Sequence, residues 1–259
     1  MISVTLESLS QPLRLAVITA AKAGCQGMVF DATGVLSPTS LGETARRELR
    51  HLFQSHLLKP VGLRCPLRRG LDEWDGLEPR LERLRQAMQL SFDLGARLIL
   101  LGLGEIPGEL NDPKRQRLKT ALQELTIFGD RIGCNIALDA GYEPVPHLIS
   151  FLHEFDTGVL GISLDPATLL REKISLTDTV FQTKNHISHT YARDMVARRL
   201  DRPAFDVPVG HGDIDWITWV SALEACSYAG SYTIRQPAVE NALESCSQAV
   251  QFLKMLGVR

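Results

Sequence analysis

The stretch VLGISLDPATLL at residues 159–170 contains the pattern that decides the fold. Its apolar residues at 160, 162 and 164 alternate with Gly161, Ser163 and Asp165, which is typical of a short β-strand. A longer segment of helical periodicity follows at 168–184. One strand followed by one helix is the repeating unit of a parallel α/β fold.

The unit recurs along the whole chain of 259 residues. Strands are predicted at 3–8, 26–31, 60–64, 97–102, 135–139, 159–165, 186–191 and 231–235. Helices are predicted after them at 11–24, 40–56, 73–94, 112–131, 145–155, 168–184, 214–229 and 238–256. Eight βα units in about 250 residues predict an α/β fold of one class, a single (β/α)8 TIM barrel with parallel strands. We expect one domain over residues 1–259.

Several helix boundaries have recognisable capping residues. Ser40 and Glu43 have the spacing of a capping box, and Asp213 is a candidate cap for the helix through Trp216. The expected helix ends coincide with glycines, which are Gly24, Gly95 and Gly133.

Composition excludes several classes of protein. The formal charge is −2 and the isoelectric point is near 6.4, so the chain lacks the basic character of most nucleic-acid-binding proteins. The longest apolar stretch, 98–103, is far shorter than the roughly 20 residues of a membrane-spanning helix. The first residues make a poor secretory signal, so we expect a cytoplasmic protein. Its five cysteines are widely scattered and predict neither a zinc site nor a disulfide framework.

The active site of such a barrel lies at the carboxyl ends of its strands. Alternation along the strands turns a set of ionisable side chains toward the interior there, namely Glu7, Asp31, Arg64, Asp139, Asp165, His189, Tyr191 and Arg235. Glu105 and His211 follow in loops. A structural core gains nothing from collecting charges, so this set predicts a polar pocket, with satisfied ion pairs at the barrel rim as the alternative.

Five stretches resemble a known family: IALDAGYEP at 136–144, GISLDPATLL at 161–170, HISHTYARD at 186–194, VPVGHGDIDW at 207–216 and YAGSYTI at 228–234. They are similar to the xylose isomerase-like TIM barrels, which include sugar and sugar-phosphate isomerases and epimerases. The resemblance implies a divalent metal held by a Glu, an Asp, a His and a closing Glu, with the two glutamates acting as acid and base. The related endonucleases need a multi-metal site that this sequence lacks.

The chain departs from that pattern at decisive positions. Asp139 replaces the first Glu and is shorter by one carbon–carbon bond of ~1.5 Å, whereas Asp165 matches. Tyr191 replaces the metal-binding His and is a poor ligand for Mg²⁺ or Mn²⁺. Arg235 replaces the closing Glu and cannot act as a general base. A divalent ion about 4 Å from this guanidinium would be repelled by about 8 kcal/mol at an effective dielectric near 20.

These departures favour a pocket without a cofactor, in which Arg235 takes the place of the metal and pairs with Asp165 and Asp139. If the family site is retained, Mn²⁺, Mg²⁺ or Zn²⁺ would bind at Asp139 and Asp165. The catalytic candidates are Asp139, Glu105, His189 and Arg235. The candidates for substrate binding are Glu7, Asp31, Arg64, Tyr191, Arg193, His211 and Trp216.

Two functions remain open. The first is a sugar isomerase/epimerase-like barrel with a degenerate metal site, acting on or binding a small sugar, polyol or sugar phosphate. The alternative is a noncatalytic metabolite-binding barrel in which Arg235 replaces the metal. The sequence leaves open whether the chain is an enzyme. The expected partner is a sugar-like small molecule, without nucleic acid or membrane, and a homo-oligomer is compatible with the sequence.

Overall fold

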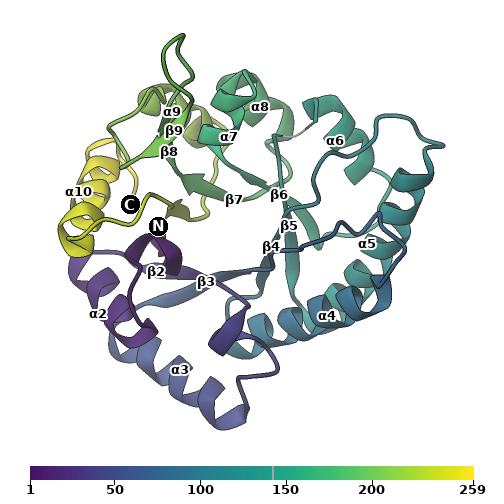
Figure 1. Ribbon diagram of the computed structural model, residues 1–259, viewed down its shortest axis with the longest axis horizontal. Coiled ribbons are helices and arrows are strands. Elements are labelled where there is room, and N and C mark those ends of the chain that lie inside the picture. The colour runs from purple at the N-terminus through teal and green to yellow at the C-terminus, as the bar shows by residue number, and fades with distance from the viewer. Residues whose placement is uncertain (142) are drawn as a thin grey trace.

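The computed structural model describes residues 1–141 and 143–259 and contains a closed parallel barrel (Figure 1). The strands follow the order β1-β10-β7-β6-β5-β4-β3-β2, and β1 pairs with both β2 and β10 to close the ring. Their bounds are β1 Ile2–Thr5, β2 Gly27–Asp31, β3 Lys59–Arg64, β4 Leu98–Leu101, β5 Asn135–Asp139, β6 Leu160–Leu164, β7 Ile187–Ala192 and β10 Tyr232–Ile234. The predicted eight-stranded TIM barrel is confirmed.

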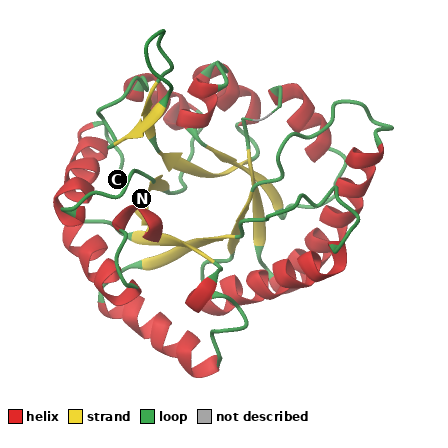
Figure 2. Ribbon diagram, viewed as in Figure 1, coloured by secondary structure: helices red, strands yellow, loops and turns green. Residues whose placement is uncertain are grey.

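Helices surround the barrel on its outside (Figure 2). The main ones are α2 Leu13–Ala23, α3 Glu43–Ser55, α4 Leu77–Leu94, α5 Pro113–Ile132, α6 Val145–Leu152, α7 Pro166–Arg171, α8 Leu176–Thr183, α9 Trp216–Ala225 and α10 Ala242–Met255. Their apolar faces pack on the outward side chains of the strands, while a second apolar cluster fills the barrel interior around Val29, Leu100 and Ala137. Within the described residues, every helix is too short or too polar to cross a bilayer.

The glycine helix ends are confirmed and the two predicted caps are wrong. Gly24, Gly95 and Gly133 end α2, α4 and α5 in the left-handed conformation. Helix α3 begins at Glu43 with Gly42 as its N-cap and no capping side chain, so residues 40 and 43 form no capping box.

Asp215, not Asp213, caps α9 and accepts a hydrogen bond from the Thr218 amide at 3.0 Å. The Asp213 carboxylate instead accepts from the Ala197 amide at 2.9 Å, because the loop before α9 turns it toward the neighbouring hairpin.

Three segments differ from the sequence-based elements. Strand β1 ends at Thr5, whose hydroxyl caps the short helix α1 (Leu6–Leu9), so Glu7 lies on a helical turn. The helix predicted at 168–184 is two helices, because Lys173 adopts a left-handed conformation with φ of 58° and Ser175 caps α8. An antiparallel hairpin of β8 (Asp194–Val196) and β9 (Phe205–Val207) was not predicted, and its loop projects beyond the helices (Figure 1).

Candidate functional site

Paired charges lie at the carboxyl ends of β1, β2, β3 and β10. The Arg64 guanidinium donates to Glu7 Oε2 at 2.8 Å and lies 3.1 Å from Asp31 Oδ1. Arg235 Nε lies 3.7 Å from the same Glu7 oxygen. Partial burial, offset in part by Arg64, raises the pKa of Asp31. The structure thus brings these four predicted residues together, with both cations held by carboxylates.

Arg235 also covers the aromatic residue that forms the floor of the site. Its guanidinium carbon lies 5.5 Å from the centre of the Tyr191 ring, within the range of a cation–π contact. Tyr191 is buried, and burial together with the charge of Asp139 raises the pKa of its phenol well above the ordinary value. Tyr191 is therefore a neutral hydroxyl at any physiological pH.

Arg235 does not pair with Asp165 as expected, because Asp165 forms its ion pair with Arg193 instead. Arg193 Nη1 donates to Asp165 Oδ2 at 2.9 Å, and its Nη2 donates to both carboxylate oxygens of Asp206 in β9 at 2.9 Å. Asp165 also caps α7, accepting from the amides of Ala167 and Thr168 and from the Thr168 hydroxyl. Both Asp165 oxygens are consequently engaged, and the hairpin is tied to the site.

Asp139, at the end of β5, has one oxygen without a partner. Its Oδ1 is enclosed and makes no hydrogen bond of normal geometry with any described residue. Desolvation and the nearby Asp165 raise its pKa to about 6, although Ser163, Arg235 and Arg64 offset part of this effect. A carboxyl group with this pKa gains and loses its proton close to neutral pH, which is the property that a general base requires.

His189 lies deeper in the barrel, below Tyr191, and the structure does not support it as a base. Its ring is fully buried, with Nδ1 3.0 Å from Ser163 Oγ and Nε2 2.7 Å from Thr233 Oγ1. Burial lowers its pKa to about 3. A neutral histidine with both nitrogens engaged is part of the barrel's internal hydrogen-bond network.

Sequence reasoning missed a second unpartnered carboxyl group, Glu143, in the loop after β5. Its side chain is buried, and neither oxygen makes a hydrogen bond of normal geometry with a described residue. Burial raises its pKa to about 7, with the charge of Glu105 adding to this effect and the nearby Ile106 backbone offsetting part of it. Glu105 itself is exposed in the loop after β4. Glu143 follows Asp139 by four residues, and this closeness in sequence was the one feature that could have pointed to it as a site residue.

Trp216 and His211 lie outside the ring of paired charges. Trp216 is buried in the helical layer, stacked edge-on against Phe252, and its indole donates to Asp194 Oδ2 at 2.9 Å. His211 is exposed in the loop before α9, with Nδ1 3.4 Å from the Val209 carbonyl. Trp216 is thus engaged by packing and by its hydrogen bond to Asp194, and its predicted substrate-binding role stays a prediction.

The loop that contains the sequence GHGDIDW is held in its conformation by hydrogen bonds to Asp194, a residue that sequence reasoning also missed. This fully buried carboxylate accepts from the amides of Gly210 and Gly212 at 2.9 and 3.0 Å, besides the Trp216 indole. A Cβ at Gly212 would overlap the Asp194 carboxylate. The loop is thus folded around one acid, and the glycines allow its backbone to approach.

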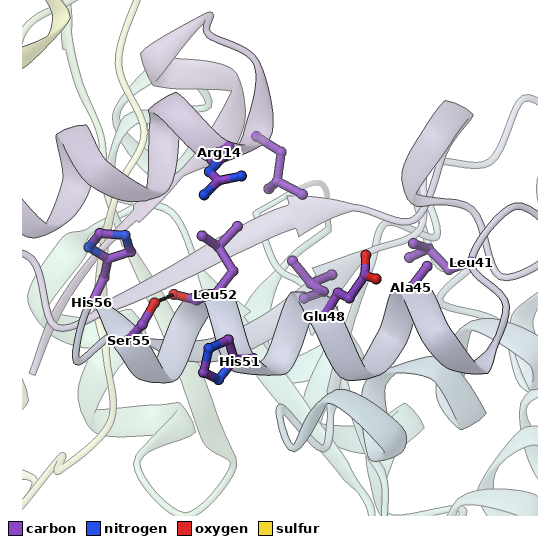
Figure 3. Close-up of a pocket in the computed structure, with 10 residues that line it drawn as sticks. Arg14, Leu41, Ala45, Glu48, His51, Leu52, Ser55 and His56 are labelled. Atoms are coloured by element: carbon purple, nitrogen blue, oxygen red, sulfur yellow. Dashed lines mark hydrogen bonds between the residues drawn. The ribbon is translucent and has the colours of Figure 1, made fainter.

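A separate hollow lies on the outside of the barrel, between α2 and α3 (Figure 3). It has a volume of about 460 Å³, an apolar floor that includes Leu49 and Leu52, and Arg14, Glu48 and His56 along its edge. None of the predicted site residues lines it. Among the residues that the structure describes, no group of three or more His, Cys, Asp or Glu side chains is arranged to hold a metal ion.

Comparison with known families identifies the chain. The family model described as xylose isomerase-like TIM barrel matches residues 17–256. The chain belongs to this family. No curated protein matches the sequence at a significant level. The family includes sugar isomerase- and epimerase-like barrels, and family members often use a divalent metal.

Solved structures of this family have the same fold at low sequence identity. A xylose isomerase domain protein from Planctomyces limnophilus has a TM-score of 0.82 and 17% identity, over 93% of this chain and 90% of its own. D-allulose 3-epimerase from Methylomonas sp. in complex with D-allulose has a TM-score of 0.79 and 18% identity, over 98% and 96%. For 3-keto-D-glucoside 4-epimerase from E. coli these values are 0.79 and 13%, over 98% of each chain. At these identities the likeness shows the fold alone.

Proposed function

We propose that this xylose isomerase-like barrel binds a neutral sugar or polyol at its mouth without a metal ion. The observation that carries the proposal is that three guanidinium groups at the mouth are each paired with carboxylates. Arg64 is held by Glu7 and Asp31, Arg235 by Glu7, and a third guanidinium, on β7, by two aspartates. An anionic ligand would have to displace one of these carboxylates.

A neutral polyol suits such a mouth better than a phosphate or carboxylate. Adjacent hydroxyl groups can accept hydrogen bonds from the guanidinium and donate to the carboxylate of the same ion pair. The carboxylate of Asp139, which is half-buried at the end of β5, would accept a further hydrogen bond from a ligand hydroxyl. The neutral phenol of Tyr191 lies beneath these groups, with the Arg235 guanidinium over its ring.

The donor chemistry supports a site without metal. Of the four positions that the family pattern assigns to the metal, 191 carries a neutral phenol and 235 a permanent cation. Asp165 already accepts four hydrogen bonds, including one from Arg193. Only Asp139 offers a free oxygen, and one carboxylate is too few for the several oxygen ligands that Mg²⁺ or Mn²⁺ requires. These residues do not fit a divalent ion.

Isothermal titration calorimetry in the presence of a chelator tests this function. A panel of neutral ketoses, aldoses and polyols, including D-allulose, would be compared with phosphorylated sugars. We expect a neutral member to bind, and the Arg235→Gln variant to lose about tenfold or more in affinity. Arg14→Gln, in the outer hollow, is the matched control and should bind normally. Tighter binding of the phosphorylated sugars, or binding only after Mn²⁺ is added, would contradict the proposal.

A second candidate function is metal-independent isomerisation, which the raised pKa of Asp139 favours. Asp139 would take a proton from the carbon beside the substrate carbonyl, and Arg235 would stabilise the developing oxyanion. Because position 235 no longer carries a carboxylate, Asp139 alone has to remove the proton and protonate the neighbouring carbon on the same face. While it is on Asp139 that proton can exchange with solvent, and the hydroxyl proton of the enediol passes to the former carbonyl oxygen. A single base restricts the reaction to a 1,2-shift between aldose and ketose, since epimerisation needs an acid on the opposite face.

Deuterium incorporation tests this second function. Each sugar that binds would be incubated with the protein in D₂O and followed by NMR. We expect exchange at the carbon beside the carbonyl, and no exchange with Asp139→Asn. Binding without any exchange would leave the chain a metabolite-binding barrel.

A further inference from the structure

Two cysteines from opposite ends of the chain meet in the helical layer. Cys25 and Cys246 are both buried, and their sulfur atoms lie 3.6 Å apart across 221 residues of sequence. Cys134 and Cys226 lie against backbone carbonyls instead. We propose that Cys25 and Cys246 are a disulfide-forming pair that joins the last helix of the barrel to its first βα unit under oxidising conditions.

Rigid elements on both sides hold the two thiols in place. Cys25 directly follows Gly24, the C-cap of α2, and its amide donates to the Ala20 carbonyl at 3.0 Å. Cys246 lies in the first half of α10, which packs beside α2 (Figure 1). A Cβ on Gly24 would lie 3.6 Å from Val250 of α10, so the two helices are in close contact at this point. A disulfide of ~2.05 Å requires only a modest rotation of the two side chains.

The oxidation is a thiol–disulfide exchange with a low-molecular-weight disulfide such as oxidised glutathione. The Cys25 thiolate attacks one glutathione sulfur, forming a mixed disulfide and releasing one glutathione thiolate. The Cys246 thiolate then attacks Cys25 Sγ, forming the protein disulfide and releasing the second glutathione. Two electrons pass to the glutathione, and the two thiol protons end on the released thiolates.

The surroundings make this exchange slow. The pKa of the Cys25 thiol lies well above its ordinary value, first because the thiol makes a hydrogen bond with Cys246 and second because it is buried. The charge of Lys254 acts in the opposite direction. Little thiolate forms at neutral pH, so the pair responds to sustained oxidation. The disulfide would also be linked to the candidate site through one hydrogen bond. Gln236, the residue after Arg235, donates to the hydroxyl of Ser245, which precedes Cys246 in α10.

The test uses the folded full-length protein, incubated with excess oxidised glutathione at mildly alkaline pH. Remaining thiols are alkylated after unfolding, and the peptides are mapped by mass spectrometry. We expect a single cross-linked peptide pair, Cys25 with Cys246, and alkylation of the other cysteines. The midpoint of thermal unfolding should rise by about 5 °C, because the bond closes a very long loop in the unfolded chain. Dithiothreitol should reverse both changes.

Variants separate this pair from general oxidation. Cys246→Ala should lose the cross-link and the thermal shift, whereas Cys226→Ser should retain both. Recovery of both thiols in alkylated form after oxidation would overturn the proposal. So would cross-links to other cysteines or glutathione retained on Cys25 alone. Because the wild-type mapping is decisive by itself, a variant that folds poorly does not prevent the test.

Discussion

Replacement of Asp139 by asparagine should stabilise the protein, which is unusual for a change at a functional site. The rise of the Asp139 pKa from 3.8 to about 6 means that the ionised form is disfavoured in the folded state. At about 1.36 kcal/mol per pH unit, this rise corresponds to about 3 kcal/mol at neutral pH. Because the mouth admits some solvent to this half-buried side chain, we expect about 2 kcal/mol for Asp139→Asn.

The sign of the pH dependence follows from the same shift. Below the ordinary pKa of 3.8 the carboxyl group is protonated in both states, and it then costs nothing. As the pH rises through the folded-state value of about 6, the buried carboxyl group has to ionise in the folded protein. The free energy of unfolding of the wild-type protein is then lowered by the full cost of that buried charge. The advantage of the asparagine variant should therefore be largest near about pH 7.5 and fall below about 1 kcal/mol near about pH 4.5.

Urea unfolding followed by circular dichroism at the two pH values measures this advantage. Asp165→Asn is the matched control with the opposite sign, because Asp165 accepts hydrogen bonds from Arg193 and from the first turn of α7. We expect that control to destabilise the fold by about 3 kcal/mol. If Asp139→Asn destabilises the protein, or stabilises it equally at both pH values, our description of Asp139 as a desolvated carboxylate with an unpaired oxygen is refuted.

Three further predictions concern the surroundings of the site. Arg193→Ala should lower the free energy of unfolding by about 3 kcal/mol in urea titrations, because it leaves the Asp165 carboxylate without its cation; an effect below about 0.5 kcal/mol would contradict the pairing. The ring protons of His189 should show no NMR titration between about pH 8 and 4.5, since its pKa is about 3; a midpoint near the ordinary value would show that the ring is not neutral and enclosed. Gly212→Ala should lower the unfolding midpoint by several degrees, because its Cβ would overlap Asp194, and normal stability would show that the loop does not depend on this close approach.

The barrel could be predicted because its signal is repeated. Eight short apolar runs, each followed by a helix, allow few topologies, and glycines such as Gly95 mark helix ends by their own conformational freedom. The hairpin of β8 and β9 could not be predicted, because its strands are short and partly exposed. The division of the predicted helix at 168–184 depends on Lys173 adopting a conformation unusual for its residue type.

Part of the charge cluster at the mouth could be predicted, and its ion pairs could not. Alternation placed Arg64 and Arg235 there, and the structure finds both beside Glu7, which lies on helix α1 and not on a strand. Alternation did not reveal that Arg193, and not Arg235, holds Asp165, because that choice depends on where the unpredicted hairpin brings its own carboxylate. Sequence position likewise shows nothing of desolvation, which sets the protonation of buried side chains in the barrel.

The central claim, a sugar site without a metal, is tested most directly by the metal content and metal affinity of the protein. Protein purified without chelator would be analysed for bound metals and titrated with Mn²⁺, Mg²⁺ and Zn²⁺ by calorimetry. The account predicts no stoichiometric metal and no heat of binding up to millimolar concentrations. A stoichiometric metal that is lost in Asp139→Asn would contradict it and would show that Asp139 and Asp165 retain the family's metal site.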